Sequence, residues 1–309
     1  MQKTIHFHVG AHKTATTYMQ SRLRANREHL RGEGVDFIDL WARTPALIQY
    51  RAQFRRLIER DVADERKILE LSEQLRAIVE EGETSSNALV VLSYENILGG
   101  FDLTQRGAPY PNAAIAIRHI IEAFPDRRVK IFLSIRSLDR FLESGYLQRV
   151  TTRRETRTFK QYFNQVDVQA LSWVPLVRAV KSLVEPEDFM LWDYESFFSD
   201  EWVIWDALLN IPNAQEALVN PAKKSNYSLS AKGLKYMRSV NKVATAEDAK
   251  KFRSFVKQNF GCQTGLKSPK LLGDAGRRQL IEIYERDRKE LAGLYDEPPI
   301  DRISEGVSK

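Results

Sequence analysis

The chain has 309 residues, of which 43% are apolar and 28% are charged, enough to bury one large core in a single elaborated domain or in two ordinary ones. Lys and Arg outnumber Asp and Glu by 47 to 41, and this net charge of +6 suits an anionic ligand. The basic residues are spread along the chain, which argues against nucleic acid as the partner. One cysteine, Cys262, allows no internal disulfide, and no apolar run approaches the ~20 residues of a membrane span. The N-terminus lacks the parts of a signal peptide, so a cytoplasmic protein with no membrane span is expected.

Short apolar segments alternate with helical patterns along the first two thirds of the chain. Strands are predicted over 4–9, 35–40, 88–93, 129–135 and 188–192. Helices are predicted over 16–31, as one or two amphipathic helices within about 46–82, and over 229–242, 246–259 and 275–296. Nearly continuous apolar strands between helices indicate a parallel sheet covered on both faces. The pattern predicts one α/β domain over 1–309, a three-layer fold with a central parallel sheet of about five strands. Helical elaborations are expected over about 46–82 and 200–300.

The loop between the first strand and the first helix has the composition of an anion site. It reads H-V-G-A-H-K-T-A-T-T from residue 8 to residue 17. Gly10 permits a tight turn, Lys13 supplies a charge, and hydroxyl donors follow at Thr14, Thr16 and Thr17. The N–H groups that begin a helix have no partners within it and favour an anion. A nucleotide-hydrolase loop would place a glycine directly before the lysine, where this chain has a histidine.

A second anion-binding pattern follows the strand predicted over 129–135. Arg136 stands at the end of that strand, and Ser144 falls two turns into the next helix, in the run I-R-S-L-D-R-F-L-E-S-G-Y. Both side chains can therefore face one phosphate from adjacent segments. A guanidinium fork on a phosphate dianion makes a strong, charge-assisted contact.

Together these two patterns resemble the PAPS-dependent sulfotransferases, which use 3'-phosphoadenosine 5'-phosphosulfate (PAPS). The first resembles their 5'-phosphosulfate loop, usually written H-x-G-x-x-K-S/T-G-T-T, with Ala15 where the family has glycine. The second resembles their 3'-phosphate element, with Leu138 at the usual proline. The resemblance implies a P-loop, nucleotide-kinase-like fold, PAPS as donor, adenosine 3',5'-bisphosphate as product, and no metal. It implies a donor site formed by Gly10, Lys13, Thr14, Ala15, Thr16, Thr17, Arg136 and Ser144.

Sulfuryl transfer requires a base for the acceptor proton and a cation near the leaving phosphate, and Lys13 is the expected cation. The run V-V-L-S-Y-E resembles an element of carbohydrate sulfotransferases whose glutamate is the base, which implies that role for Glu95. The alternative is that Ser93 caps a helix and Glu95 complements its dipole. His12, inside the loop, is the competing base, since small-molecule members of the family use a histidine.

Three further features have a functional and an ordinary interpretation. His6, His8 and His12 could form a metal site, but the resemblance already explains His8 as a residue at the loop entrance. Tyr194 could contact adenine or pack in the core. The basic stretch Arg149, Arg153, Arg154 and Arg157 is a solvated surface, or a lid or contact for an acidic glycan.

The sequence thus favours a sulfotransferase that acts on a hydroxyl or amine. Because of the Glu95 element, a sugar hydroxyl of a glycan or glycolipid is the leading acceptor, and a phenol, a lipid or an antibiotic scaffold stays open. A small-metabolite kinase using ATP and magnesium is one alternative. A non-enzymatic nucleotide-binding protein is the other.

Overall fold

The computed structural model describes residues 3–60, 64–100, 103–106, 108–220 and 228–293. Five strands form one parallel sheet in the order β2-β3-β1-β4-β5. The strands are β1 Thr4–His8, β2 Val35–Ile38, β3 Leu89–Ser93, β4 Arg128–Ile135 and β5 Phe189–Asp193. The predicted α/β class, with its parallel sheet of five strands and additional C-terminal helices, is confirmed.

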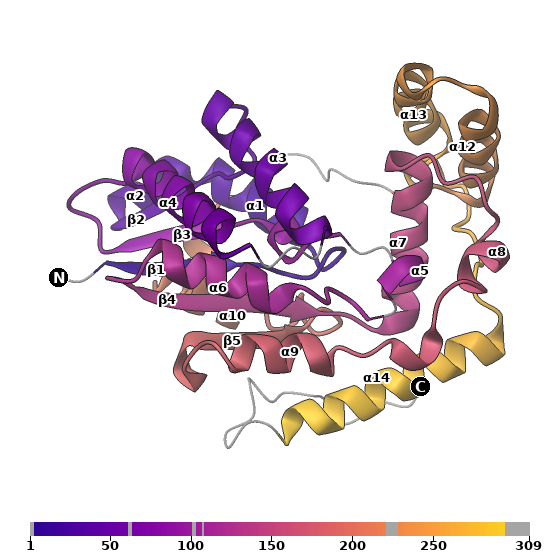
Figure 1. Cartoon of the computed structure of the whole chain (residues 1–309). Coiled ribbons are helices and arrows are strands. Elements are labelled where there is room, and N and C mark those ends of the chain that lie inside the picture. Colours follow the sequence, from indigo (N-terminus) through magenta and orange to yellow (C-terminus); the bar gives the residue numbers. More distant parts are fainter. Residues whose placement is uncertain (1–2, 61–63, 101–102, 107, 221–227, 294–309) are drawn as a thin grey trace.

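Helices connect the strands and extend the C-terminal part of the chain (Figure 1). The α-helices up to β5 are α1 Thr16–Ala25, α2 Arg27–Gly32, α3 Pro45–Glu59, α4 Glu65–Gly82, α5 Leu103–Arg106, α6 Ala113–Ala123, α7 Leu138–Thr152, α8 Phe159–Phe163 and α9 Val174–Lys181. Those after β5 are α10 Glu201–Leu209, α11 Ala214–Ala217, α12 Ala231–Val243, α13 Ala246–Phe260 and α14 Asp274–Ala292. Short 3-10 helices are η1 Glu95–Leu98, η2 Val168–Ala170, η3 Pro186–Asp188 and η4 Cys262–Thr264.

The sheet separates two apolar cores because alternate side chains of each strand point to opposite faces. Ile5 and Phe7 of β1 enter the larger core, which contains buried side chains of α3, α4, α6 and α9. His6 and His8 of the same strand point to the other face, where the second core gathers side chains of α1, α2, α10 and α11. Helices therefore cover both faces, as the continuous apolar strands predicted.

A buried ion pair joins α1 to α10 within the second core. Arg22 Nη1 donates to Glu201 Oε1 at 2.7 Å, and both side chains are more than nine-tenths buried. Trp205 Nε1 and the Tyr18 hydroxyl donate to the same oxygen, at 2.7 and 2.8 Å. Breaking a buried pair leaves an uncompensated charge, which costs several kcal/mol, about 3–5. This network therefore holds α1, and with it the loop that precedes α1, at a defined place against the sheet.

Several of the predicted boundaries are wrong, among them the start of the helix expected over 229–242, which begins at Ala231. The helix expected over 16–31 is interrupted at Asn26, whose side chain donates to Val219 O and accepts from Val219 N. This bonding to a distant segment replaces the continuation of the helix, and no local pattern announces it. The strand expected over 35–40 ends at Ile38. The last residues of the helix expected over 275–296 lie outside the described residues.

The helices α12 and α13 lie at one end of the α/β body, and α14 runs back along it. Figure 1 shows α12 and α13 side by side beyond α7, away from the sheet, and α14 running past α9. α12 packs on α7, and α14 contacts both α7 and α9. No helix in the described ranges is long and apolar enough to cross a bilayer.

Candidate functional site

The loop that joins β1 to α1 has a backbone shaped to hold an anion. Gly10, Lys13 and Ala15 have positive φ angles of 37°, 69° and 62°. Successive turns of this kind direct backbone N–H groups into one concavity, which is a common anion site in proteins. Ala15 occupies the N-cap position of α1 and provides no side-chain acceptor, so the first N–H groups of the helix have no capping partner there. These N–H groups can therefore bind an external anion.

Gly10 is required by close contacts as well as by its φ angle. A Cβ atom at this position would lie 2.7 Å from Thr16 Cγ2 and 3.0 Å from His8 Nε2. Real Cβ atoms do not approach other atoms so closely, so any side chain here would displace the start of α1.

The left-handed conformation of Ala15 leads to a prediction about stability. Such a conformation costs a non-glycine residue roughly 1–2 kcal/mol. Replacing alanine by glycine also makes the unfolded chain more flexible, which by itself lowers the free energy of unfolding by about 0.4–1 kcal/mol. Ala15→Gly should therefore raise the free energy of unfolding by up to about 1 kcal/mol, measured by denaturant titration. The control is Ala52→Gly on the exposed side of α3, which should lower it by about 1 kcal/mol. Equal losses in the two variants would contradict the strain at Ala15.

The three threonines of the loop have different environments. Thr14 is fully buried, and its hydroxyl donates to Ala11 O at 2.6 Å and accepts from the Ser134 hydroxyl. Its hydroxyl proton is thus used within the loop, and its backbone N–H is the group left for a ligand. Thr16 is buried against Gly10, whereas Thr17 is only partly buried. In the described part of the chain no side-chain hydrogen bond involves Thr17, so its hydroxyl is the threonine donor best able to meet an anion.

Arg136 lies beside the loop that joins β1 to α1. Its Nη1 donates to Lys13 O at 2.8 Å, across 123 residues of sequence. Its guanidinium carbon lies 4.5 Å from the centroid of the Tyr194 ring, and its Nε lies 3.8 Å from Glu195 Oε1. Trp173 Nε1 donates to Arg136 O at 2.7 Å. These contacts orient the guanidinium, and within the described ranges Nη2 has no partner and can bind an anion.

Ser144 and Arg140 lie along α7, which begins two residues after Arg136. Ser144 is half-buried, and its hydroxyl has no hydrogen bond to any described residue. Arg140 is 61% exposed, with the Asp139 carboxylate 3.8 Å away. Tyr146, on the same helix, is buried and donates to Arg157 O at 2.7 Å. The structure thus places Ser144 on the helix that follows Arg136 and gives Tyr146 a packing role.

Several charges act on the Lys13 ammonium. Burial and, to a smaller extent, the positive charges of Arg136 and Lys257 together lower the pKa of Lys13 to about 8, against the opposite effect of Glu95. Arg136 and Glu95 therefore both lie within electrostatic reach of Lys13 at the carboxyl edge of the sheet. A group with these neighbours is one that an anion would stabilise in its charged form.

Glu95 begins η1 directly after β3, and Gln20 of α1 holds it. Gln20 Nε2 donates to Glu95 Oε2 at 2.8 Å, and the Gln20 side chain is almost entirely buried. Ser93 does not cap η1, because its hydroxyl instead bonds His8 Nδ1 at 2.9 Å. Among the described residues, no hydrogen bond involves the other Glu95 oxygen.

The His12 ring is held at both nitrogens. Its Nδ1 lies 2.8 Å from the Tyr110 hydroxyl, which also accepts from the His12 backbone N–H, so the hydroxyl proton points to Nδ1. Its Nε2 lies 2.7 Å from Asn96 Oδ1 and donates to it. Burial lowers the pKa of His12. A neutral ring with both nitrogens bonded is a poor proton acceptor, and it fixes the loop against η1.

The other two histidines near the loop have separate partners. His6 Nδ1 bonds Leu208 O at 2.8 Å, and His8 stacks on Trp192. Burial lowers the pKa of His6 to about 4 and that of His8 to about 3, so both rings are neutral at physiological pH. Across the described residues, no group of three His, Cys, Asp or Glu side chains has the arrangement of metal ligands.

The basic stretch after α7 is largely engaged within the protein. Arg157 Nε donates to the buried Glu155 at 2.8 Å, and Arg149 lies 3.5 Å from the same carboxylate. Arg154 donates to Asn241 O and Ala244 O of the α12 segment. Arg149 and Arg157 therefore pair with Glu155 within the segment that follows α7, and Arg154 joins this segment to α12.

Three residues of the site were not predicted from the sequence: Gln20, Asn96 and Tyr110. Gln20 follows Thr16 by four residues and so shares its helical face, which is a usable signal. Asn96 adjoins Glu95 directly. Tyr110 lies in the connection before α6 with a φ of 53°, and nothing in its local sequence links it to His12.

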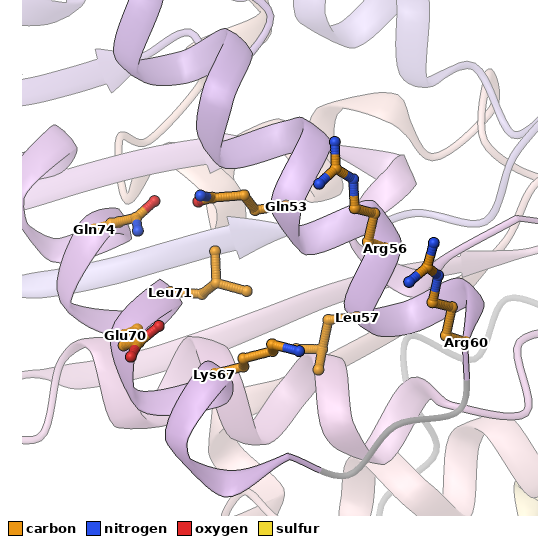
Figure 2. Close-up of a pocket in the computed structure, with 8 residues that line it drawn as sticks. All are labelled: Gln53, Arg56, Leu57, Arg60, Lys67, Glu70, Leu71 and Gln74. Carbon is orange, nitrogen blue, oxygen red and sulfur yellow. The ribbon is translucent and has the colours of Figure 1, made fainter.

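A separate cavity of about 300 Å³ lies between α3 and α4 (Figure 2). Leu57 and Leu71 form its apolar base, and its rim is polar: Gln53, Arg56, Arg60, Lys67, Glu70 and Gln74. None of the residues of the loop site lines it.

Comparison with known proteins finds similarity in structure only. No family model matches the chain, and no curated protein matches it. A sulfotransferase from Alicyclobacillus acidocaldarius is similar at 17% identity and a TM-score of 0.42, over 73% of this chain and 87% of that one. Retinol dehydratase, in complex with androsterone and the inactive cofactor PAP, is similar at 12% identity and a TM-score of 0.37. The match covers 93% of this chain and 81% of that one.

The sulfotransferase domain from the curacin biosynthetic pathway is similar at 12% identity and a TM-score of 0.37, over 92% of this chain and 98% of that one.

Proposed function

We propose that this protein is a sulfotransferase that moves a sulfuryl group from PAPS to a hydroxyl or amine of an acceptor. The observation that carries the proposal is the hydrogen bond from Arg136 to Lys13 O, which joins the two predicted phosphate elements into one site. Around it lie an uncapped helix N-terminus, a loop with three positive φ angles and a carboxylate. Two phosphate-binding elements suit a nucleotide that carries separate 3' and 5' groups.

In this proposal each element has a defined task. The N–H groups of the loop and of α1, with Lys13 and the Thr17 hydroxyl, bind the 5'-phosphosulfate, while Arg136 and Ser144 bind the 3'-phosphate. The Tyr194 ring, already stacked under the Arg136 guanidinium, contacts adenine. Glu95 takes the acceptor proton as the new bond to sulfur forms, and Lys13 stabilises the charge on the leaving phosphate as its bond to sulfur breaks. Gln20 and His12 are positioning residues.

The choice of acceptor class is supported by the resemblance of the Glu95 element to that of carbohydrate sulfotransferases. A carboxylate held at the end of an interior strand can orient and deprotonate a sugar hydroxyl, so we propose a glycan or glycolipid acceptor. Transfer of radiolabel from PAPS to sugars, phenols, amines and lipids tests this choice. Preferential labelling of a phenol or an amine would contradict it.

Binding of the spent cofactor tests the donor. Two phosphates held by a few charge-assisted bonds of roughly 1.5–3 kcal/mol each should give adenosine 3',5'-bisphosphate a micromolar or lower Kd, about −8 kcal/mol. Isothermal titration calorimetry measures it. Tighter binding of ATP with magnesium than of the bisphosphate would contradict the proposal and favour a kinase.

The depressed pKa of Lys13 predicts how this affinity depends on pH. In the free protein the ammonium loses its proton as the pH rises through about 8. A bound anion favours the protonated form, so affinity should fall above that pH and approach a loss of about tenfold per pH unit. Lys13→Arg keeps its charge throughout and should show little change between about pH 8 and 9.5. If the affinity of both proteins for the bisphosphate fell equally with pH, a group other than Lys13 would be the one that titrates.

A further inference from the structure

The helical hairpin formed by α12 and α13 carries the entire net charge of the protein. Residues 231–260 contain eight Lys and Arg and two Asp and Glu, a net charge of +6. The whole chain also has +6, so the remaining residues balance at 39 basic and 39 acidic. This asymmetry is hidden in the overall composition, in which basic residues are spread widely. It points to an anionic partner at this end of the molecule.

Five of the eight basic side chains of the hairpin are exposed. On α12 the exposed side chains recur at helical spacing as one stripe: Lys232, Lys235, Tyr236, Ser239, Lys242 and Val243. No acidic residue interrupts this stripe. Lys250 and Lys251 of α13 are exposed as well.

A continuous strip of aromatic rings runs from the α12 stripe onto α13. The ring centroids of Tyr236 and Phe260 are 4.7 Å apart, those of Phe260 and Phe255 are 6.2 Å apart, and those of Phe255 and Phe252 are 5.4 Å apart. Phe252 is 43% exposed and Phe255 is 51% exposed. Lys232 Nζ lies 5.4 Å from the Phe260 ring, so the lysine stripe and the aromatic strip adjoin.

This combination identifies the chemistry of the partner. Lysines alone would suit any polyanion, because their ammonium groups need only negative charge. Phenylalanine has no hydrogen-bonding group, and a hydrated anionic polymer would leave Phe252 and Phe255 in water. The interface of a bilayer with anionic lipids satisfies both groups, since it takes aromatic rings below the headgroups and attracts basic side chains.

We propose that the α12–α13 hairpin docks the protein on the surface of a membrane that contains anionic lipids. The hairpin stands away from the sheet beyond α7, which leaves its face accessible (Figure 1). It also borders the loop site, because Lys257 of α13 lies within electrostatic reach of Lys13. Lys257 and Phe255 lie two positions apart and so on opposite sides of the helix. Docking through the Phe255 side therefore keeps the Lys257 side toward the loop. This proposal does not depend on the reaction.

Sedimentation of the full chain with vesicles tests the proposal. Binding is expected to phosphatidylcholine vesicles that contain phosphatidylglycerol and not to phosphatidylcholine alone. Two variants alter only exposed side chains: Lys232→Glu with Lys235→Glu and Lys242→Glu, and Phe252→Ser with Phe255→Ser. Each should weaken binding at least about tenfold, on the scale of basic and aromatic contributions at such a surface. Thermal unfolding verifies that both variants fold.

A matched control separates a local effect from a general charge effect. Lys160→Glu with Arg286→Glu and Lys289→Glu makes the same change of charge at exposed positions outside the hairpin and should bind like the unaltered protein. A loss as large as that of the lysine variant of the hairpin would overturn the proposal, as would no binding to anionic vesicles. Two results together would assign the face to a polyanion instead. The phenylalanine variant would bind vesicles as the unaltered protein does, and the protein would bind a sulfated polysaccharide through the lysines alone.

Discussion

Replacing Glu95 by Gln should reduce turnover by about 10²–10⁴, the usual contribution of a positioned general base, while binding of the bisphosphate stays normal. The amide preserves the size of the side chain, and its oxygen can still accept from Gln20 Nε2, which lies 2.8 Å from the carboxylate in the unaltered protein. It cannot accept a proton. Single-turnover rates with PAPS and calorimetry with the bisphosphate measure the two quantities separately.

His12 is the competing candidate for the base, so the His12→Asn variant is compared with the Glu95→Gln variant. His12→Asn removes a ring whose two nitrogens already bond Tyr110 and Asn96. It should therefore disturb the loop and weaken donor binding more than it lowers the rate with bound donor. Near-normal turnover of the Glu95→Gln protein, with a large loss in the His12→Asn protein, would refute Glu95 as the base and give that role to His12.

Arg136→Ala should weaken binding of adenosine 3',5'-bisphosphate by roughly 2–3 kcal/mol, or about 30- to 150-fold. The guanidinium supplies a charge-assisted contact to the 3'-phosphate in the proposed site. It also anchors Lys13 O at 2.8 Å, so the loop should loosen slightly. Adenosine 5'-monophosphate, which lacks the 3'-phosphate, should therefore lose only about 0.5–1.5 kcal/mol, the value of one ordinary hydrogen bond. Calorimetry with both nucleotides gives the difference.

The matched control for Arg136 is Arg140→Ala. This variant removes the same charge from the beginning of α7, but the Arg140 side chain is 61% exposed and only approaches Asp139. An exposed pair contributes little, so both affinities should stay within about threefold of the unaltered protein. Equal losses of the two nucleotides in the Arg136 variant would mean that Arg136 supports the loop and does not bind the 3'-phosphate.

The sequence alone determined the elements whose signals are local. Largely apolar runs of five to seven residues between helical patterns predicted all five strands and their parallel arrangement, because a strand buried on both faces must be mostly apolar. The turn at Gly10 and Lys13 could also be predicted from the sequence, because the residues that form a turn between a strand and a helix are adjacent in the chain. The position of Arg136 between a strand and a helix could be predicted for the same reason.

Only the tertiary structure decided which distant residues meet. Arg136 reaches Lys13 O across 123 residues, Gln20 reaches Glu95 from α1, and Tyr110 holds both the backbone and the ring of His12. The break at Asn26 depends on Val219 in the same way. No local pattern encodes such pairs, because each is selected by packing between elements that the sheet brings together. The hairpin could not be predicted from the sequence for the same reason. Its lysines and phenylalanines form one surface because α12 packs beside α13.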